Sequence, residues 1–206
     1  MGYCSYWNKS SDVNIKYHDD EWGVPLWNDR GQFEYLMLEV MQCGLNWDLV
    51  INKREIFRKC FDNFDYDLIS KYTEKDIERI MQTEGMIKSE KKIRAVIHNA
   101  ICFQKIRKEY GCFCNYIWQF SGNKTILYNK HEIGYIPSSN GLSDKIANDL
   151  KKHGFMFLGT ITIYSHLQAV GIINDHGKDC PRYKYINANY PTIKKHRYLE
   201  KNVHKF

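Results

Sequence analysis

Six stretches of this chain carry apolar residues at helical spacing, and this pattern restricts the fold more than any other feature of the sequence. Five of the six end at a glycine, the residue preferred just after the last turn of a helix. Alternation with a period of two, the sign of a half-buried strand, is almost absent. The sequence therefore predicts an all-α fold, with helices over residues 29–43, 46–61, 73–85, 89–111, 143–154 and 160–171.

The bulk properties indicate a folded globule with a polyanionic partner. A length of 206 residues fits one domain with a sizeable core, and the net charge of +6 favours nucleic acid. No apolar run is long enough to cross a membrane and the N-terminus lacks a secretory signal, so we expect a cytoplasmic protein. Seven irregularly spaced cysteines do not indicate a disulfide framework. We expect one domain over residues 1–183 and a basic, partly disordered tail over residues 184–206.

Two pairs of soft ligands stand near opposite ends of the sequence. His176 and Cys180 are four residues apart in "NDHGKDC", and Cys4 and His18 frame "CSYW…YHDDEWG". Zinc prefers four Cys or His ligands in a tetrahedron, and four protein ligands make a closed, structural site. The alternative is that these pairs arise by chance, as scattered His and Cys often do.

A second candidate site lies in "TEGMIKSEKKI". Two predicted helices meet there at a tight turn with Gly85, and the second helix opens at Ser89 among Lys88, Lys91 and Lys92. Such a helix-hairpin-helix directs backbone N–H groups at a DNA phosphate, and the lysines add attraction that is independent of sequence. An ordinary corner between two helices with solvated lysines is the alternative.

The third candidate is an acid in an apolar helix. Between Phe33 and Cys43 only Glu34 and Glu39 are charged, and a buried carboxylate needs a partner or becomes neutral. Glu39 is therefore either a paired structural acid, which the sequence alone favours, or a group that awaits a ligand. Aromatic residues suited to a pocket that stacks a flat base cluster nearby in the sequence. They are Tyr6, Trp7, Tyr17, Trp22, Trp27 and Trp47.

Together, "YHDDEWGVP", "LEVMQCGLNW", "TEGMIKSEKKIRAVIHNA", "HGFMFLGTITIYS" and "NDHGKDC" resemble the 3-methyladenine DNA glycosylase I family over roughly residues 3–183. The resemblance implies a helix-hairpin-helix glycosylase fold of two helical lobes. It also implies one structural zinc ion, which joins the N- and C-terminal segments. The implied ligands are Cys4, His18, His176 and Cys180. The implied activity is hydrolysis of the N-glycosidic bond of 3-methyladenine in double-stranded alkylated DNA, without cleavage of the strand.

The resemblance also assigns roles within the site. In the family's pattern Glu39 is the catalytic residue that contacts the edge of the excised base, while Tyr17 and Trp47 stack on it or enclose it. Gly44 and Leu45 correspond to a loop that fills the gap left in the duplex by the flipped nucleotide. Further candidates for the wall of the base pocket are Tyr6, Trp7 and Trp22.

The residues agree with this chemistry. Methylation at N3 makes the purine cationic, so the base leaves readily, and aromatic faces attract such a cation by about 0.5 to 2 kcal/mol per contact. No aspartate occurs between Asp76 and Asp144, where many helix-hairpin-helix glycosylases carry a catalytic acid. Lyase chemistry needs an amine nucleophile in the pocket, and the lysines of "IKSEKK" belong to the predicted phosphate-binding turn instead.

Three positions depart from the family's pattern. Tyr6 stands where Trp is usual and Trp7 follows it, so which of the two rings lines the pocket is open. Asn14 stands where an aromatic residue is common, and Asn46 replaces the usual Ser before Trp47, where it is expected to cap a helix.

Two other functions fit parts of the pattern. A zinc-stabilised module that binds damaged DNA without cutting it would share the hairpin and the lysines, and a zinc hydrolase would need an open metal position. Glu39 together with Trp47 favours catalysis over the non-catalytic module. We expect a monomeric enzyme that acts on double-stranded alkylated DNA.

Overall fold

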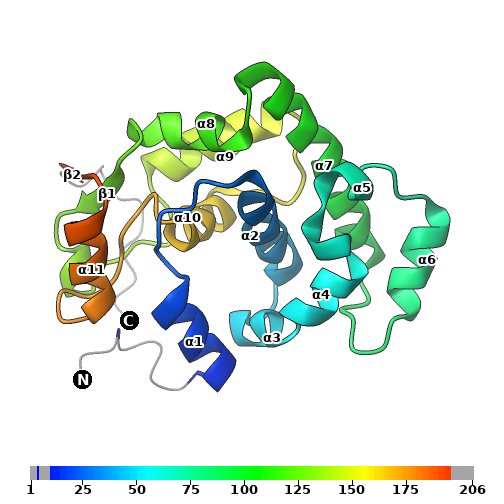
Figure 1. Cartoon of the computed structure of the whole chain (residues 1–206), viewed down its shortest axis with the longest axis horizontal. Coiled ribbons are helices and arrows are strands. Elements are labelled where there is room, and N and C mark those ends of the chain that lie inside the picture. Colours follow the sequence, from blue (N-terminus) through cyan, green and yellow to red (C-terminus); the bar gives the residue numbers. More distant parts are fainter. Residues whose placement is uncertain (1–3, 5–9, 196–206) are drawn as a thin grey trace.

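The computed structural model describes residue 4 and residues 10–195, most of which are helical (Figure 1). The α-helices are α1 (Asp12–Asp20), α2 (Asp29–Gln42), α3 (Trp47–Asn52), α4 (Arg54–Cys60), α5 (Tyr66–Ile69), α6 (Glu74–Gln82), α7 (Glu90–Tyr110), α8 (Phe113–Trp118), α9 (Gly141–Lys152), α10 (Thr160–Ala169) and α11 (Pro181–Asn189). The other elements are the 3-10 turns η2 (Asp62–Phe64), η3 (Gln119–Ser121) and η4 (His131–Ile133) and the strands β1 (Thr125–Tyr128) and β2 (Thr192–Lys195). None of the described helices is long and apolar enough to span a lipid bilayer.

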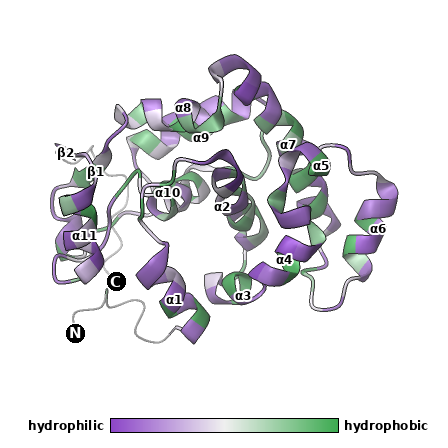
Figure 2. Cartoon of the chain, viewed as in Figure 1, coloured by the Kyte–Doolittle hydropathy of each residue, from purple (hydrophilic) through white to green (hydrophobic). Residues whose placement is uncertain are grey.

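Helix α2 lies in the middle of the molecule, with α3, α7, α8 and α10 packed against it (Figure 1). It begins after Asn28, whose side chain accepts a hydrogen bond from the Gly31 N–H at 2.7 Å. Every residue from Gln32 to Met41 is buried, so no side of this stretch faces solvent. Helix α2 carries both hydrophilic and hydrophobic residues, as the outer helices α4, α6 and α11 do (Figure 2), so its burial follows from its central position. Helix α2 is therefore the core element of the fold.

The C-terminal end of α2 is closed by a lysine from α7. The Lys92 ammonium group donates hydrogen bonds to the carbonyl oxygens of Met41 and Cys43, each at 2.7 Å. The last carbonyl groups of a helix have no partner within it, and a cation beside them is favoured by the helix dipole. This contact fixes the loop between α2 and α3 to α7.

The predicted helices are present, with differences at their ends. The helix expected over residues 46–61 is divided at Lys53 into α3 and α4. Asn46 caps α3 as predicted, because its side chain accepts from the Asp48 N–H at 2.7 Å. Helix α9 begins before residue 143 because Asn140 supplies a cap further upstream. Helix α1 follows a cap at Ser11 and was missed, since its sequence has little apolar periodicity.

The two strands pair in parallel at the edge of the molecule opposite α6 (Figure 1). Ile126 of β1 lies opposite Ile193 of β2. They form the only sheet within residues 10–195, and the all-α prediction did not include it. In the tail that the sequence predicts to be partly disordered, residues 184–195 form the end of α11 and then β2. Residues 196–206 lie outside the described residues.

Two glycines allow the loop after α1 to contact the end of α10. Gly171 has φ of +75°, and a Cβ atom there would lie 2.5 Å from the Pro25 nitrogen and 2.6 Å from the Gly23 carbonyl oxygen. The Gly23 N–H donates to the Ala169 carbonyl oxygen at 3.2 Å. This close approach places the residues around Gly23 beside the segment that follows α10.

Candidate functional site

The four predicted metal ligands meet in one buried cluster. The side-chain donor atoms of Cys4, His18, His176 and Cys180 all lie within 4.8 Å of one another, and none of these residues is more than 5% exposed. The grouping predicted from the sequence is confirmed as a set of residues that can hold one metal ion.

The two histidines of the cluster are held so that one nitrogen of each faces a thiol. His176 Nε2 donates to the Trp22 carbonyl oxygen at 2.9 Å, and its Nδ1 lies 3.7 Å from Cys4 Sγ and 3.6 Å from Cys180 Sγ. A tetrahedral zinc ion sets its sulfur and nitrogen ligands roughly 3.6 Å apart, so this spacing fits zinc.

His18 is oriented in the same way by its neighbour Asp19. Its Nδ1 donates to the Asp19 carboxylate at 2.8 Å, and its Nε2 faces Cys180 Sγ at 3.9 Å. A carboxylate behind a histidine is the usual support for a metal ligand. Hydrogen bonds from Cys4, His176 and His18 hold the pKa of the Cys180 thiol far below its usual range, which favours the thiolate that a metal binds.

Gly23 makes room for the His176 ring. It has φ of +79°, and a Cβ atom there would lie 2.8 Å from His176 Nε2. The Trp22 ring packs edge-on against the His176 ring, with 4.6 Å between the centroids, and stacks on His18 at 5.9 Å. The "EWG" of the N-terminal motif therefore positions both histidines.

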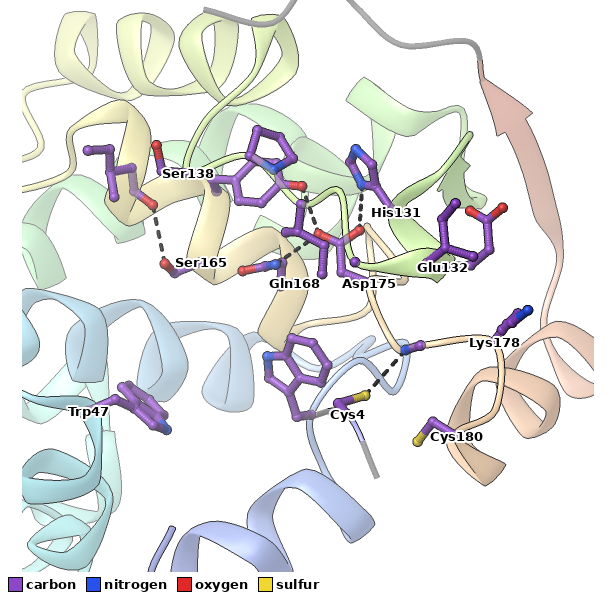
Figure 3. Close-up of a pocket in the computed structure, with 18 of the residues that line it drawn as sticks. Cys4, Trp47, His131, Glu132, Ser138, Ser165, Gln168, Asp175, Lys178 and Cys180 are labelled. Carbon is purple, nitrogen blue, oxygen red and sulfur yellow. Dashed lines mark hydrogen bonds and ion pairs between the residues drawn. The ribbon is translucent and has the colours of Figure 1, made fainter. Parts of the chain in front are cut away.

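A cleft of about 1040 Å³ extends from this cluster to the end of α2. Figure 3 shows Cys4 and Cys180 on one side of it and Trp47 on the other. The wall is formed by α1, α2, α3, α10 and the segment from η4 to residue 138. Those of its lining residues that were predicted as site residues are Cys4, Tyr17, Trp22, Glu39, Trp47 and Cys180.

Glu39 is the acid of this cleft. It is 4% exposed, and no described residue donates a hydrogen bond to its carboxyl group; burial alone raises its pKa to about 8. The rings of Tyr17 and Trp47 lie next to each other with 5.4 Å between their centroids. The Trp47 Nε1–H is buried and has no acceptor among the described residues. The Glu39 carboxyl group and the Trp47 indole N–H thus have no hydrogen-bond partner among the described residues.

Glu34, the other acid of α2, has the environment expected of a structural carboxylate. It accepts hydrogen bonds from Arg54 at 2.7 Å and from Arg58 at 2.8 Å. Arg54 also binds Glu21 at 2.7 Å. The sequence alone favoured a paired structural acid at Glu39. Glu34 has such partners, whereas Glu39 has none among the described residues and has the properties of a group that awaits a ligand.

A family model described as methyladenine glycosylase matches residues 7–183. The chain belongs to this family. A curated relative, DNA-3-methyladenine glycosylase 1 of Escherichia coli strain K12, is 37% identical over 177 residues, which are 86% of this chain and 95% of the relative.

Solved structures of the methyladenine glycosylase family have the same fold. A crystal structure of 3-methyladenine DNA glycosylase I superimposes with a TM-score of 0.82 at 38% identity, and the match covers 87% of this chain and 98% of that one. A Tyr-to-Phe variant of such an enzyme, in complex with 3-methyladenine, superimposes with a TM-score of 0.81 at 30% identity, covering 88% and 97%.

The remaining aromatic candidates are Trp27, Tyr6 and Trp7, and the structure describes only the first. Trp27 is half exposed and stacks on Trp118 at 4.3 Å, outside the cleft. Asn14, where the family pattern favours an aromatic residue, is buried in α1 and does not line the cleft. Tyr6 and Trp7 lie outside the described residues, so their placement as base-binding residues stays a prediction.

Helices α6 and α7 meet at the predicted turn. Gly85 has φ of +75° and is exposed, as are Lys88 and Lys91, while Ser89 is half-buried at the start of α7. The prediction that Lys92 contacts phosphate is wrong: it is 9% exposed and its ammonium group is bound to the last carbonyl groups of α2. Gly44 is exposed and Leu45 half-buried in the loop after α2.

A buried aspartate that the sequence analysis does not assign to the site lies on the far wall of the cleft. Asp175 is buried and accepts hydrogen bonds from His131 at 2.7 Å, Tyr164 at 2.7 Å and Gln168 at 2.8 Å (Figure 3). Its position next to His176 in "NDH" was the one available signal. These bonds hold η4 and α10 against the segment that carries the metal ligands.

The state of Glu39 predicts an unusual effect on stability. Because its folded pKa is raised to about 8, the carboxyl group binds a proton more tightly in the folded chain, and the free energy of unfolding falls as pH rises from about 4.5 to 8. Glu39→Gln should therefore be more stable than the wild type by up to about 5 kcal/mol at pH 9, and equally stable near pH 4. Urea unfolding across this pH range measures the difference.

Glu34→Gln is the matched control, since it leaves Arg54 and Arg58 without their shared carboxylate. It should lower the free energy of unfolding by about 3 kcal/mol. If Glu39→Gln destabilised the chain in the same way, Glu39 would be a structural acid.

Proposed function

We propose that this chain is a DNA repair enzyme that excises 3-methyladenine from alkylated double-stranded DNA by hydrolysing the N-glycosidic bond. The observation that carries the proposal is the buried Glu39 carboxyl group, which has no described partner and faces a cleft beside Tyr17 and Trp47. The names of the relatives, DNA-3-methyladenine glycosylase and 3-methyladenine DNA glycosylase I, agree with it.

The charge of the lesion explains how this cleft selects it. A nucleotide methylated at N3 carries a cationic purine, whereas normal adenine is neutral. When the cation enters, its attraction lowers the pKa of Glu39 and restores the carboxylate, so binding releases a proton. The faces of Tyr17 and Trp47 add about 0.5 to 2 kcal/mol each. Neutral adenine gains neither contribution.

The same charge drives the bond cleavage. The C1′–N9 bond breaks, its electron pair neutralises the purine, and a water oxygen bonds to C1′ and gives its proton to solvent. Among the described residues that line the cleft Lys178 is the only lysine, and it lies on the side of Cys180, away from Trp47 (Figure 3). We therefore propose a monofunctional enzyme that leaves the strand intact.

Release of 3-methyladenine from methylated duplex DNA is the decisive measurement. The wild type should release it, with kcat/KM rising as pH rises through about 8, because the carboxylate form of Glu39 binds the cation. Glu39→Gln should lower kcat/KM at least about tenfold and abolish this rise. A wild-type protein that binds methylated duplex but releases no base would instead be a damage-binding module.

We further propose that the hairpin of α6 and α7 binds the DNA backbone through the Gly85 turn, Lys88, Ser89 and Lys91. The first N–H groups of α7 donate no hydrogen bond to the Ser89 side chain, which leaves them for a phosphate. The Lys53 ammonium group donates to the Gly85 carbonyl oxygen at 2.6 Å and steadies the turn.

Lys88→Ala should weaken binding to duplex DNA and reduce the slope of log Kd against log salt by about 1. Lys184→Ala removes an exposed lysine from α11, at the edge opposite α6, and should leave the slope unchanged (Figure 1). Equal slopes for the wild type and Lys88→Ala would rule out a phosphate contact at this residue.

For the metal centre we propose one structural zinc ion held by Cys4, His18, His176 and Cys180. Two thiols, two imidazoles and their spacing suit zinc, and four protein ligands leave no position for a substrate. When bound, the ion supplies a cross-link between the N-terminal segment and the segment that follows α10.

Cys180→Ser should lose zinc, measured by elemental analysis, and lower the free energy of unfolding by several kcal/mol because metal binding is coupled to folding. Cys112→Ser, at a half-buried cysteine outside the cluster, should keep its zinc. If Cys180→Ser lost zinc and activity but unfolded like the wild type, the ion would be catalytic.

A further inference from the structure

The loop between α9 and α10 turns two large apolar side chains to solvent. Met156 is 44% exposed and Phe157 is 40% exposed, whereas Phe155 and Leu158 on either side are buried. Phe157 also has φ of +62°, a left-handed conformation that costs a residue other than glycine about 1 kcal/mol or more. Exposure and strain at one tip indicate a site of interaction rather than a packing element.

Side chains from two helices hold this tip in place. The amide of Asn99, which is fully buried, donates to the Met156 carbonyl oxygen at 3.0 Å and accepts from the Met156 N–H at 2.8 Å. Cys43 Sγ donates to the Phe157 carbonyl oxygen at 3.6 Å. The exposed rings are therefore presented by a fixed backbone.

Helix α7 joins this tip to the loop after α2. Lys92 binds the end of α2, and Asn99 binds the tip. These two residues are seven positions apart, so they lie on one face of α7 about two turns from each other. Cys43 bridges the two loops directly, and its N–H donates to the Glu39 carbonyl oxygen at 3.2 Å. Cys43, which contacts the tip, precedes Gly44 and follows Glu39 by one helical turn. The tip therefore lies next to the Gly44–Leu45 loop and near the end of α2 that carries Glu39.

The apolar surface continues from the tip toward the cleft. Ile161, in the first turn of α10, is 59% exposed and lines the cleft. Lys91, the exposed lysine of α7 that is proposed to contact phosphate, lies about 12 Å from Asn99 along the helix axis, a distance similar to the width of the major groove. One duplex can therefore reach the hairpin, the tip and the mouth of the cleft together.

We propose that Phe157 inserts beside Leu45 as a second wedge and stacks on the bases that border the flipped nucleotide. The proposal rests on the proposed function, because a nucleotide that enters the cleft leaves a gap in the duplex, and unstacking costs a few kcal/mol. Leu45 alone offers one half-buried aliphatic side chain. An aromatic ring stacked on a base strengthens binding to DNA, and apolar wedges of this kind enter base steps in other DNA-binding proteins.

The test uses a duplex that contains a tetrahydrofuran abasic-site analogue, with 2-aminopurine placed either opposite the analogue or next to it. Phe157→Ala should bind this duplex about tenfold more weakly or worse, and should lose the change in 2-aminopurine emission that the wild type produces at one of the two positions. Phe157→Leu should restore part of the affinity but not the emission change. Binding of free 3-methyladenine should stay unchanged in both variants.

Leu68→Ala is the matched control, since Leu68 is an apolar residue of similar exposure (48%) on α5. It should bind the duplex like the wild type. Equal affinity and equal emission changes for the wild type and Phe157→Ala would overturn the proposal. Failure of the proposed function shows separately, as absence of 3-methyladenine release by the wild type, and does not affect the outcome with the abasic duplex.

Discussion

Burial of helix α2 on every side is the constraint on which the rest of the structure depends. A helix without a solvent face must be surrounded, and α3, α7, α8 and α10 supply that surround. Water cannot solvate the two carboxyl groups of such a buried helix, so each depends on its protein surroundings. Glu34 is neutralised by Arg54 and Arg58, whereas Glu39 is held uncompensated at the point where the cleft reaches the helix. The packed core holds the Glu39 carboxyl group in one position although its burial destabilises the fold. A site that binds a charged ligand needs such a fixed group.

The metal cluster and Glu39 stand at different parts of one cleft, and Trp22 connects the cluster to the cleft wall. Its carbonyl oxygen orients His176, its ring packs on both histidines, and it also lines the cleft. The hydrogen bonds of Asp175, the residue before His176, hold α10 and η4 at the opposite wall. The cluster therefore supports the shape of the cleft from outside the place where a base would bind.

The sequence was most informative where function restricts residue types. Helical spacing and glycine stops located most of the long helices. The motifs also grouped Cys4 and His18 with His176 and Cys180, and the structure brings these four residues together. Local pattern could not reveal contacts between distant segments. Lys92 looked like a phosphate ligand because nothing in its neighbourhood indicates that it caps α2. The tail looked disordered because β2 is stabilised by β1, far away in the chain. Phe157 was not singled out, because exposure of an apolar residue is a property of the fold.

The long-range contacts also order the events of biosynthesis. Cys4 lies beside Cys180, and Thr125 pairs with Thr192, so the four-residue cluster and the sheet form only after nearly all described residues have left the ribosome. Helix α2 and its neighbours α3 and α7 are translated much earlier, and domains fold as their segments emerge. During that interval Cys4 and His18 have already been synthesised, whereas His176 and Cys180 have not. The order of synthesis therefore separates formation of the core around α2 from formation of the cluster that joins the two ends of the described chain.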